Sequence, residues 1–464
     1  MKRLALDAFR SWLTSKNRQP LVLRGARQVG KTWLVRDLAK SASLTLLELN
    51  FERNPEYTKL FSARAPRAIY DDIALQLETN PRPDQALLFL DEIQSAPEVL
   101  AQLRWFSEEM PELAVVAAGS LLEFALADMP HSMPVGRIRY GFLEPLSFEE
   151  YLIANQQERL LERWASWQPG TLVSDTLHNK TLEWFDRYQM TGGMPAVVSA
   201  AINGADAAEC RQIQRDLIQT YRDDFSKYSG RMNPRILNAT LLATVHEMGK
   251  KFVYSHVDES IRHTQAKHAL ELLAMSRLCT LIPHTQANGL PLGAETNERI
   301  RKVSLLDVGL AHGLWNTPAA GNHPSWHSLS PMIRGNLTEQ IVAQQLRIAM
   351  GGFGWEGQLF HWRREGGRSG EIDYIVEING SIVPIEVKSG KAGSMKSLHQ
   401  FMYDKQLPLA LRLDRNPPSM QTMQIKTTQG NEVTYQLLNL PYYLVWKLAD
   451  PNIYAPIILP VISH

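Results

Sequence analysis

Short apolar runs alternate with amphipathic segments along the first part of the chain. The runs of strand length are residues 20–24, 44–51, 86–92 and 113–120. Apolar residues at helical spacing mark the segments 33–40 and 100–106 between them. Because buried strands that alternate with helices form parallel sheets covered on both faces, this pattern predicts an α/β domain over residues 1–155.

The pattern changes after this first domain. Residues 156–231 are polar and helical with one sharp break at 192–195, which predicts a helical lid. Residues 232–314 contain three helical segments followed by two apolar runs, 278–282 and 301–307. Three helices followed by a two-stranded wing predict a winged helix-turn-helix.

A linker and a second α/β unit complete the chain. Residues 315–332 interleave Gly, Pro, Ser, His and Trp, which favours a loop. After this loop, apolar runs and amphipathic segments alternate again. A helix at 337–346 begins an α/β unit that we expect over residues 333–464. The strands expected there are 360–364, 370–377 and 382–390. We therefore expect an α/β protein with a P-loop parallel sheet, a helical lid, a winged helix-turn-helix and a restriction-endonuclease-like end.

Composition and charge limit the classes of function only weakly. The chain has 464 residues, which is enough for roughly three domains of ~150 residues. A net charge of +1 gives no overall attraction to nucleic acid, so any such contact must come from local patches. The two cysteines, Cys210 and Cys279, are too few and too far apart for a disulfide framework or a zinc site. Without an apolar run long enough for a membrane span, or a signal peptide, we expect a cytoplasmic protein with no membrane partner.

A complete phosphate-binding loop follows the first apolar run. Its sequence, G-A-R-Q-V-G-K-T, matches the motif in which backbone N–H groups surround the α- and β-phosphates. The lysine of this motif reaches the β- and γ-phosphates, and the hydroxyl binds Mg²⁺. The helix that follows presents its positive N-terminus to the phosphates. We therefore expect ATP to be bound by Gly25, Ala26, Arg27, Gln28, Val29, Gly30, Lys31 and Thr32.

Two later strands end in polar residues that complete such a site. The run 86–92 ends in Asp91 and Glu92, where an aspartate would contribute to the Mg²⁺ shell and a glutamate would activate the attacking water. The run 113–120 ends in Ser120, a candidate sensor of the γ-phosphate that is equally suited to cap the next helix.

Two arginines follow the predicted nucleotide core. Arg137 or Arg139 could bring positive charge to the transition state in the same chain or in a neighbouring subunit, which would make a homo-oligomer plausible. A surface pair with a carboxylate is the plainer alternative for each.

A second set of charged residues lies near the C-terminus. Glu339 falls on a predicted helix, Asp373 on a strand, and Glu386 lies two residues before Lys388 on the next strand. Side chains on a strand alternate faces, so Glu386 and Lys388 point the same way. Carboxylates in this order could hold Mg²⁺ while the lysine polarises a water, which is the chemistry of PD-(D/E)XK phosphodiesterases. Cores of this kind also serve as inactive interaction domains, and Gln400 is a further candidate member.

The third helix of the predicted winged domain carries polar residues of two possible uses. His263, Gln265, Lys267 and His268 could enter a nucleic-acid groove. They are equally typical of the exposed face of a winged helix that only packs against protein.

Taken together, these motifs resemble a widespread group of prokaryotic AAA+ ATPases that carry a C-terminal domain of unknown function. The matching stretches are 24–32, 88–92, 119–124, 136–148, 192–195, 306–310 and 386–390. The resemblance implies AAA+ ATPase activity with Lys31, Thr32, Asp91, Glu92 and Ser120 in their usual roles. Trp33 departs from the small polar residue that many P-loops have at that place.

Two functions follow as expectations. The first is an ATP- and Mg²⁺-dependent ATPase whose nucleotide state controls a metal-dependent nuclease-like domain acting on nucleic acid, with DNA favoured over RNA. The alternative is an ATP-dependent switch or DNA-binding regulator whose C-terminal domain is a non-catalytic docking module.

Overall fold

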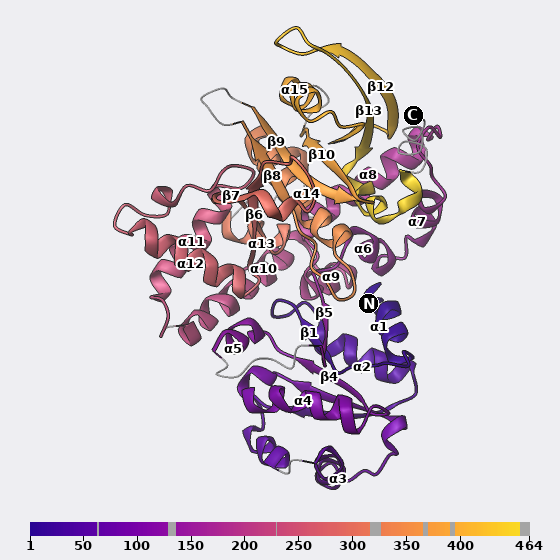
Figure 1. Cartoon of the computed structure of the whole chain (residues 1–464), viewed down its shortest axis with the longest axis vertical. Helices are drawn as coiled ribbons and strands as arrows, with labels where there is room; N and C mark the ends of the chain where they lie inside the picture. The colour runs from indigo at the N-terminus through magenta and orange to yellow at the C-terminus, as the bar shows by residue number, and fades with distance from the viewer. Residues whose placement is uncertain are drawn as a thin grey trace. The chain divides into compact units, whose positions relative to one another are not determined.

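The computed structural model describes residues 1–62, 65–128, 136–228, 230–315, 326–364, 370–389 and 395–454. The chain forms two compact units (Figure 1). The first unit comprises Met1–Pro145, Met275–Leu278 and Gly352–Glu356. The second comprises Leu146–Ala274, Cys279–Gly351 and Gly357–His464.

A parallel sheet is the centre of the first unit. Its described strands are β1 (Leu21–Arg24), β2 (Thr45–Asn50), β3 (Ala86–Asp91), β4 (Ala114–Ala118) and β5 (Arg139–Phe142). They lie in the order β2-β3-β4-β1-β5, and each neighbouring pair is parallel. The predicted parallel α/β domain is therefore confirmed. The order places the ends of β1, β3 and β4 at one edge, where the predicted nucleotide motifs lie.

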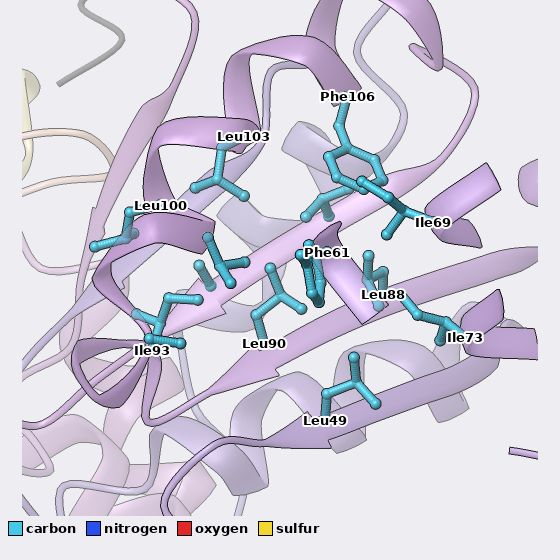
Figure 2. Close-up of a cluster of buried hydrophobic side chains, with 14 of the residues drawn as sticks. Leu49, Phe61, Ile69, Ile73, Leu88, Leu90, Ile93, Leu100, Leu103 and Phe106 are labelled. Atoms are coloured by element: carbon cyan, nitrogen blue, oxygen red, sulfur yellow. The ribbon is translucent and has the colours of Figure 1, made fainter. Parts of the chain in front are cut away.

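Helices cover both faces of this sheet. They are α1 (Ala5–Leu13), α2 (Lys31–Ser41), α3 (Pro66–Gln76), α4 (Pro97–Glu109) and α5 (Leu122–Asp128), with 3₁₀ turns η1 (Pro55–Ser62), η2 (Pro83–Gln85) and η3 (Ile93–Ser95). All six residues of β3 are buried, as expected for a strand covered on both sides. Figure 2 shows Leu88 and Leu90 of this strand in one cluster with Leu103 of α4. Each such leucine contributes roughly 2 kcal/mol by leaving water, and together they fix the end of β3.

The first part of the second unit is helical. Its elements are α6 (Phe148–Ala154), α7 (Glu158–Ala165), α8 (Asp175–Thr191), α9 (Pro195–Ile202), α10 (Ala207–Asp224), η4 (Phe225–Tyr228), α11 (Pro234–His246), η5 (Tyr254–His256), α12 (His263–Met275) and α13 (Val308–Trp315). Residues 156–231 are thus mainly helical, as the polar pattern indicates. Their role as a lid stays a prediction.

A mixed sheet forms the rest of the second unit. Its strands are β6 (Cys279–Thr285), β7 (Thr296–Leu305), β8 (Phe360–Arg363), β9 (Glu371–Ile378), β10 (Ser381–Val387), β11 (Leu409–Asp414), β12 (Ser419–Lys426) and β13 (Glu432–Pro441). The described strands lie in the order β12-β13-β11-β10-β9-β8-β6-β7. Packed with them are α14 (Pro331–Met350), α15 (Lys396–Lys405), η6 (Leu292–Glu295), η7 (Trp326–Ser328), η8 (Tyr442–Ala449) and η9 (Pro451–Ile453).

One sheet crosses the boundary that the sequence suggests at the linker 315–332. The predicted wing strands are β6 and β7, which pair with each other in antiparallel fashion. β6 also pairs with β8 through His284 and His361, so the predicted wing continues into the predicted nuclease-like domain (Figure 1). Hydrophobic periodicity cannot reveal pairing between strands so far apart in sequence. The domain limits, the winged helix and the nuclease-like fold stay predictions.

Among the described residues, none of the helices combines the length and the apolar character that crossing a membrane requires.

Candidate functional site

The loop between β1 and α2 has the backbone that the phosphate-binding motif requires. Gly25, Gln28 and Gly30 have positive φ angles of 153°, 64° and 98°. A Cβ atom on Gly25 would lie 2.5 Å from the Leu143 carbonyl oxygen, so this position requires glycine. Gly30 caps the N-terminus of α2 in a left-handed conformation. These turns curl the loop around the helix N-terminus, where N–H groups attract anions.

Lys31 lies folded onto this loop. Its ammonium donates hydrogen bonds to the carbonyl oxygens of Gly25 and Ala26, both at 2.9 Å. Burial lowers the pKa of Lys31 to about 8, and the charges of Glu92 and Asp91 oppose that shift. A buried ammonium satisfied only by neutral carbonyls is ready to exchange them for phosphate oxygens, which form stronger, charge-assisted bonds.

Asp91 ends β3 beside the loop. Its Oδ2 accepts hydrogen bonds from the Thr32 hydroxyl and the Asn50 amide, each at 3.2 Å. Burial raises the pKa of this carboxyl, and the charge of Glu92 adds to the shift. The Thr32 hydroxyl and the Asp91 carboxylate are hard oxygen donors, so the residues present fit Mg²⁺.

Asn50 is a contact that the sequence prediction missed. It ends β2 and pairs in register with Asp91 on β3. The signal was present, because the run 44–51 carries this one amide near its end, but the order of the strands was needed to place it beside Asp91.

Glu92 follows Asp91 and is held by two neighbours. Its Oε2 accepts hydrogen bonds from the Ser120 hydroxyl at 3.1 Å, the Ser120 N–H at 3.3 Å and the Gln94 amide at 2.6 Å. Ser120 therefore contacts the candidate base directly. The sequence prediction missed Gln94. It lies two residues after Glu92, and nothing in this short spacing indicates that its side chain turns back to the Glu92 carboxylate.

The two arginine candidates lie in different surroundings. Arg137 forms an ion pair with Glu108 at 2.7 Å, and its side chain is 56% exposed. The guanidinium of Arg139 lies over the Phe353 ring, 4.9 Å from the centroid. The Arg137 pair matches the plainer surface alternative, whereas Arg139 contacts an aromatic ring. A transition-state role for either arginine stays a prediction.

Arg277 is a further charged group of the first unit that the sequence prediction missed. Its guanidinium lies 2.7 Å from Glu356, 3.3 Å from Glu123 and 3.6 Å from Glu144. The side chain is only 10% exposed. The charge of Arg277 also lowers the pKa of Lys31, which puts it within electrostatic reach of the phosphate-binding loop. No local motif could indicate this, because Arg277 lies far downstream of that loop in the sequence.

In the second unit, the predicted C-terminal residues gather around a lysine. Lys302 of β7 is 2% exposed, and its ammonium faces Glu339 of α14 and Glu371 and Asp373 of β9. Burial would lower the pKa of Lys302, but the three carboxylates outweigh it and hold that pKa well above its ordinary value. We call Lys302, Glu339, Glu371 and Asp373 the acidic centre. Sequence reasoning assigned no chemistry to Lys302 or Glu371.

Glu386 and Lys388 lie next to the acidic centre. Asp373 Oδ2 accepts a hydrogen bond from the Val387 N–H at 2.8 Å, which ties β9 to β10. Glu386 accepts a hydrogen bond from the Lys388 ammonium. Burial raises the pKa of Glu386 to about 7, the charge of Asp373 adds to the shift, and Lys388 opposes it. The predicted set thus converges, while Gln400 donates to Asp404 on its own helix.

The acidic centre does not fit a divalent metal as it is arranged. Lys302 already supplies a cation at the point where the carboxylates meet. Across the described stretches of the chain, no group of three or more His, Cys, Asp or Glu side chains could hold a metal ion. The prediction of Mg²⁺ bound by Glu339, Asp373 and Glu386 therefore finds no support in this arrangement.

The predicted groove-facing residues of α12 are exposed. They are His263, Gln265, Lys267 and His268. Lys267 lies 3.7 Å from Glu271 one turn later, as on an ordinary solvated helix face. Both uses of this helix stay open.

Three sequence families match successive parts of the chain. Residues 17–152 match the family described as an AAA domain. Residues 182–320 and 334–435 each match a domain of unknown function, DUF8612 and DUF4143 respectively. No curated protein matches the sequence.

Solved structures with similar parts have low sequence identity to the chain. A Walker-type ATPase of Pyrococcus abyssi is 15% identical, with a TM-score of 0.43, over 68% of this chain and 95% of its own. The Orc1 protein of Aeropyrum pernix, solved in complex with DNA, is 15% identical with a TM-score of 0.26, over 68% and 91% of the two chains. The PCH-2 protein of C. elegans is 16% identical with a TM-score of 0.26, over 42% and 58%.

The family match covers the same residues as the loop, the parallel sheet and the polar strand ends. Lys31 and Thr32 on the loop, with Asp91 at the end of β3, stand in the order that P-loop ATPases require. Residues 17–152 therefore match an AAA domain, and this match supports an AAA-type P-loop ATPase in this part of the chain.

Proposed function

We propose that the first unit binds ATP with Mg²⁺ at the loop Gly25–Thr32 and hydrolyses it with Glu92 as the general base. The contact between Thr32 and Asp91, with Glu92 directly after it, carries this proposal. It brings the hydroxyl of the loop and the acidic end of β3 together, as phosphoryl transfer requires.

Each side chain has a distinct part in this reaction. Lys31 would leave the carbonyls of Gly25 and Ala26 for the β- and γ-phosphate oxygens. Thr32 and Asp91 would hold Mg²⁺, which supplies positive charge to those phosphate oxygens.

Glu92 would take a proton from the attacking water. Ser120 and Gln94 donate to Oε2 of Glu92, and within the described part of the chain no donor is seen on its Oε1. This arrangement anchors one carboxylate oxygen and leaves the other for the water.

The test separates binding from turnover. Glu92→Gln should bind ATP normally but lower turnover by about 10²- to 10⁴-fold, the usual contribution of a general base. Glu98→Gln, the same change at an exposed carboxylate of α4, is the matched control. Steady-state hydrolysis and the binding of a fluorescent ATP analogue give the two readouts. Turnover by Glu92→Gln within a few-fold of the wild type would refute the role of Glu92.

For the second unit we propose a docking role that the nucleotide state controls. Lys302 inside the acidic centre supports docking over metal-dependent cleavage. Nuclease action on DNA, or less readily on RNA, is the second candidate, because Glu339, Asp373 and Glu386 do converge with Lys388. Wild-type protein with ATP and Mg²⁺ or Mn²⁺ should leave single- and double-stranded DNA and RNA intact. Cleavage that Asp373→Ala abolishes would favour the nuclease.

A further inference from the structure

A cavity of about 470 Å³ lies among the helices α6, α8 and α10 of the second unit. This volume falls within the range of about 300–1,000 Å³ that is usual for sites that bind small molecules. Part of its wall is apolar or aromatic and includes Tyr151, Trp184, Met190 and Trp326. The described residues that line it include none of the phosphate-binding loop or of the acidic centre, so neither of those sites accounts for the cavity.

The wall of this cavity contains a buried cation. Arg211 of α10 lines the cavity with only 3% of its surface exposed. Its Nη1 donates a hydrogen bond to Gln214 Oε1 at 2.6 Å, whereas its Nε is buried without a hydrogen-bond acceptor. In the described part of the chain, no carboxylate forms an ion pair with Arg211. Because a buried charge is tolerated only when it is paired, this guanidinium lacks a negative partner.

Gln214 holds the guanidinium in place. Its amide nitrogen donates to the carbonyl oxygens of Met190 at 3.2 Å and Thr191 at 3.0 Å, which leaves its Oε1 for Arg211. Burial lowers the pKa of Arg211 to about 10, and the charge of Arg215 adds to that shift. The guanidinium is therefore positively charged at neutral pH, and its position is fixed before any ligand binds.

The carboxylates in the same wall have other partners or face solvent. Asp186 forms two hydrogen bonds with the guanidinium of Arg415, at 2.7 and 2.9 Å. Asp206 caps α10 by accepting hydrogen bonds from the first N–H groups of that helix. Glu183 is exposed. These negative charges would repel a ligand with several negative charges, so the wall favours a ligand with one.

Aromatic side chains of the wall provide a surface for a flat group. The rings of Tyr151 and Trp184 meet edge to face, with centroids 6.4 Å apart. The guanidinium of Arg187 lies 4.6 Å from the centroid of the Trp184 ring. Arg187 and Glu183 are exposed, so a solute can enter from their side. Aromatic walls with one fixed charge suit a ligand that has a flat apolar body and one charged end.

We propose that this cavity binds a small aromatic carboxylate, whose negative group pairs with Arg211 and whose ring packs against Tyr151 and Trp184. A planar guanidinium can donate to both oxygens of a carboxylate at once. The ligand would thus supply the negative charge that the chain does not give to Arg211. This site goes beyond the ATPase and the docking role proposed above.

The experiment measures binding by the full-length, nucleotide-free protein in calorimetry, with benzoate, naphthoate and indoleacetate as probes. At least one of these acids should bind with one-to-one stoichiometry. The corresponding neutral amide should bind at least about tenfold more weakly, the usual loss with one charge-assisted hydrogen bond. Arg211→Gln should weaken binding of the acid by at least about tenfold and leave binding of the amide unchanged. Arg215→Gln, at an exposed arginine one turn later on α10, is the matched control and should bind the acid like the wild type.

Three results would overturn the proposal. They are no binding of any of the three acids, equal affinity of the wild type for an acid and its amide, and undiminished binding of the acid by folded Arg211→Gln. If Arg211→Gln does not fold, the comparison of acid and amide on the wild type still decides the role of charge. Trp184→Ala then tests the site, because it should weaken the acid and the amide by the same factor, and unchanged binding of both would place the ligand elsewhere.

Inorganic phosphate distinguishes the class of anion. It should displace the bound acid only at much higher concentration, and displacement with equal affinity would overturn the assignment of a carboxylate. Because all of these measurements use protein without nucleotide, their outcome does not depend on whether the first unit hydrolyses ATP.

Discussion

The contact between Ser120 and Glu92 leads to a prediction with a defined magnitude. Ser120→Ala removes the hydroxyl that lies 3.1 Å from Glu92 Oε2. A hydrogen bond to a charged group contributes about 1.5–3 kcal/mol. If that bond orients Glu92 in the transition state, its loss lowers kcat by about 10- to 150-fold, since about 1.4 kcal/mol corresponds to a factor of ten.

The structure places the expected effect at the lower end of this range. The Ser120 N–H at 3.3 Å and the Gln94 amide at 2.6 Å remain on the same oxygen after the change. We therefore expect kcat to fall about tenfold while the KM for ATP stays constant.

Steady-state hydrolysis across a range of ATP concentrations is the assay. The control is Ser95→Ala, at an exposed serine in the 3₁₀ turn that follows Glu92. A rise in KM with unchanged kcat would mean that Ser120 contacts the γ-phosphate instead. Unchanged kinetics would refute both roles.

Two further predictions concern charged groups of the first unit. The pKa of Lys31 is about 8 in the absence of nucleotide, and only the ammonium form attracts phosphate, so ATP affinity should fall about tenfold per pH unit above 8. Binding measured between about pH 6.5 and 9.5 tests this, and a constant affinity would contradict it. Arg277→Ala leaves the carboxylates of Glu123, Glu144 and Glu356 without their shared cation, which should cost about 3–5 kcal/mol of unfolding free energy. Thermal unfolding measures both variants. Arg137→Ala, which removes an exposed ion pair, should cost less than about 1 kcal/mol of unfolding free energy, and equal losses for the two variants would refute the difference between a buried and an exposed pair.

The sequence was sufficient to predict those site residues that lie close together along the chain. The loop Gly25–Thr32 and the pair Asp91–Glu92 each lie within a few residues, and their backbone is set by local turns and one buried strand. The apolar runs placed β1, β3 and β4 because these strands are buried almost throughout. The hydrophobic pattern also placed Glu339, Asp373 and Glu386 on α14, β9 and β10.

The remaining contacts depend on which distant segments pair. Asn50 reaches Asp91 only because β2 and β3 are neighbours in register. Arg277 and Lys302 come from segments remote in sequence from the carboxylates they neutralise. In the sequence, neither can be distinguished from an ordinary surface arginine or lysine. A lysine at the centre of a carboxylate cluster cannot be distinguished from a surface lysine until the sheet is known.

The continuous sheet from β6 to β13 has a consequence for how this protein can be divided. One family match ends at residue 320 and the next begins at residue 334. Strands from the two matched segments nevertheless pair at His284 and His361, and Lys302 of the first segment contacts carboxylates of the second. A gene fragment encoding residues 333–464 alone would produce β8 with an unpaired edge and carboxylates without their cation. We therefore expect the segment 333–464 not to fold stably when it is expressed without the strands β6 and β7.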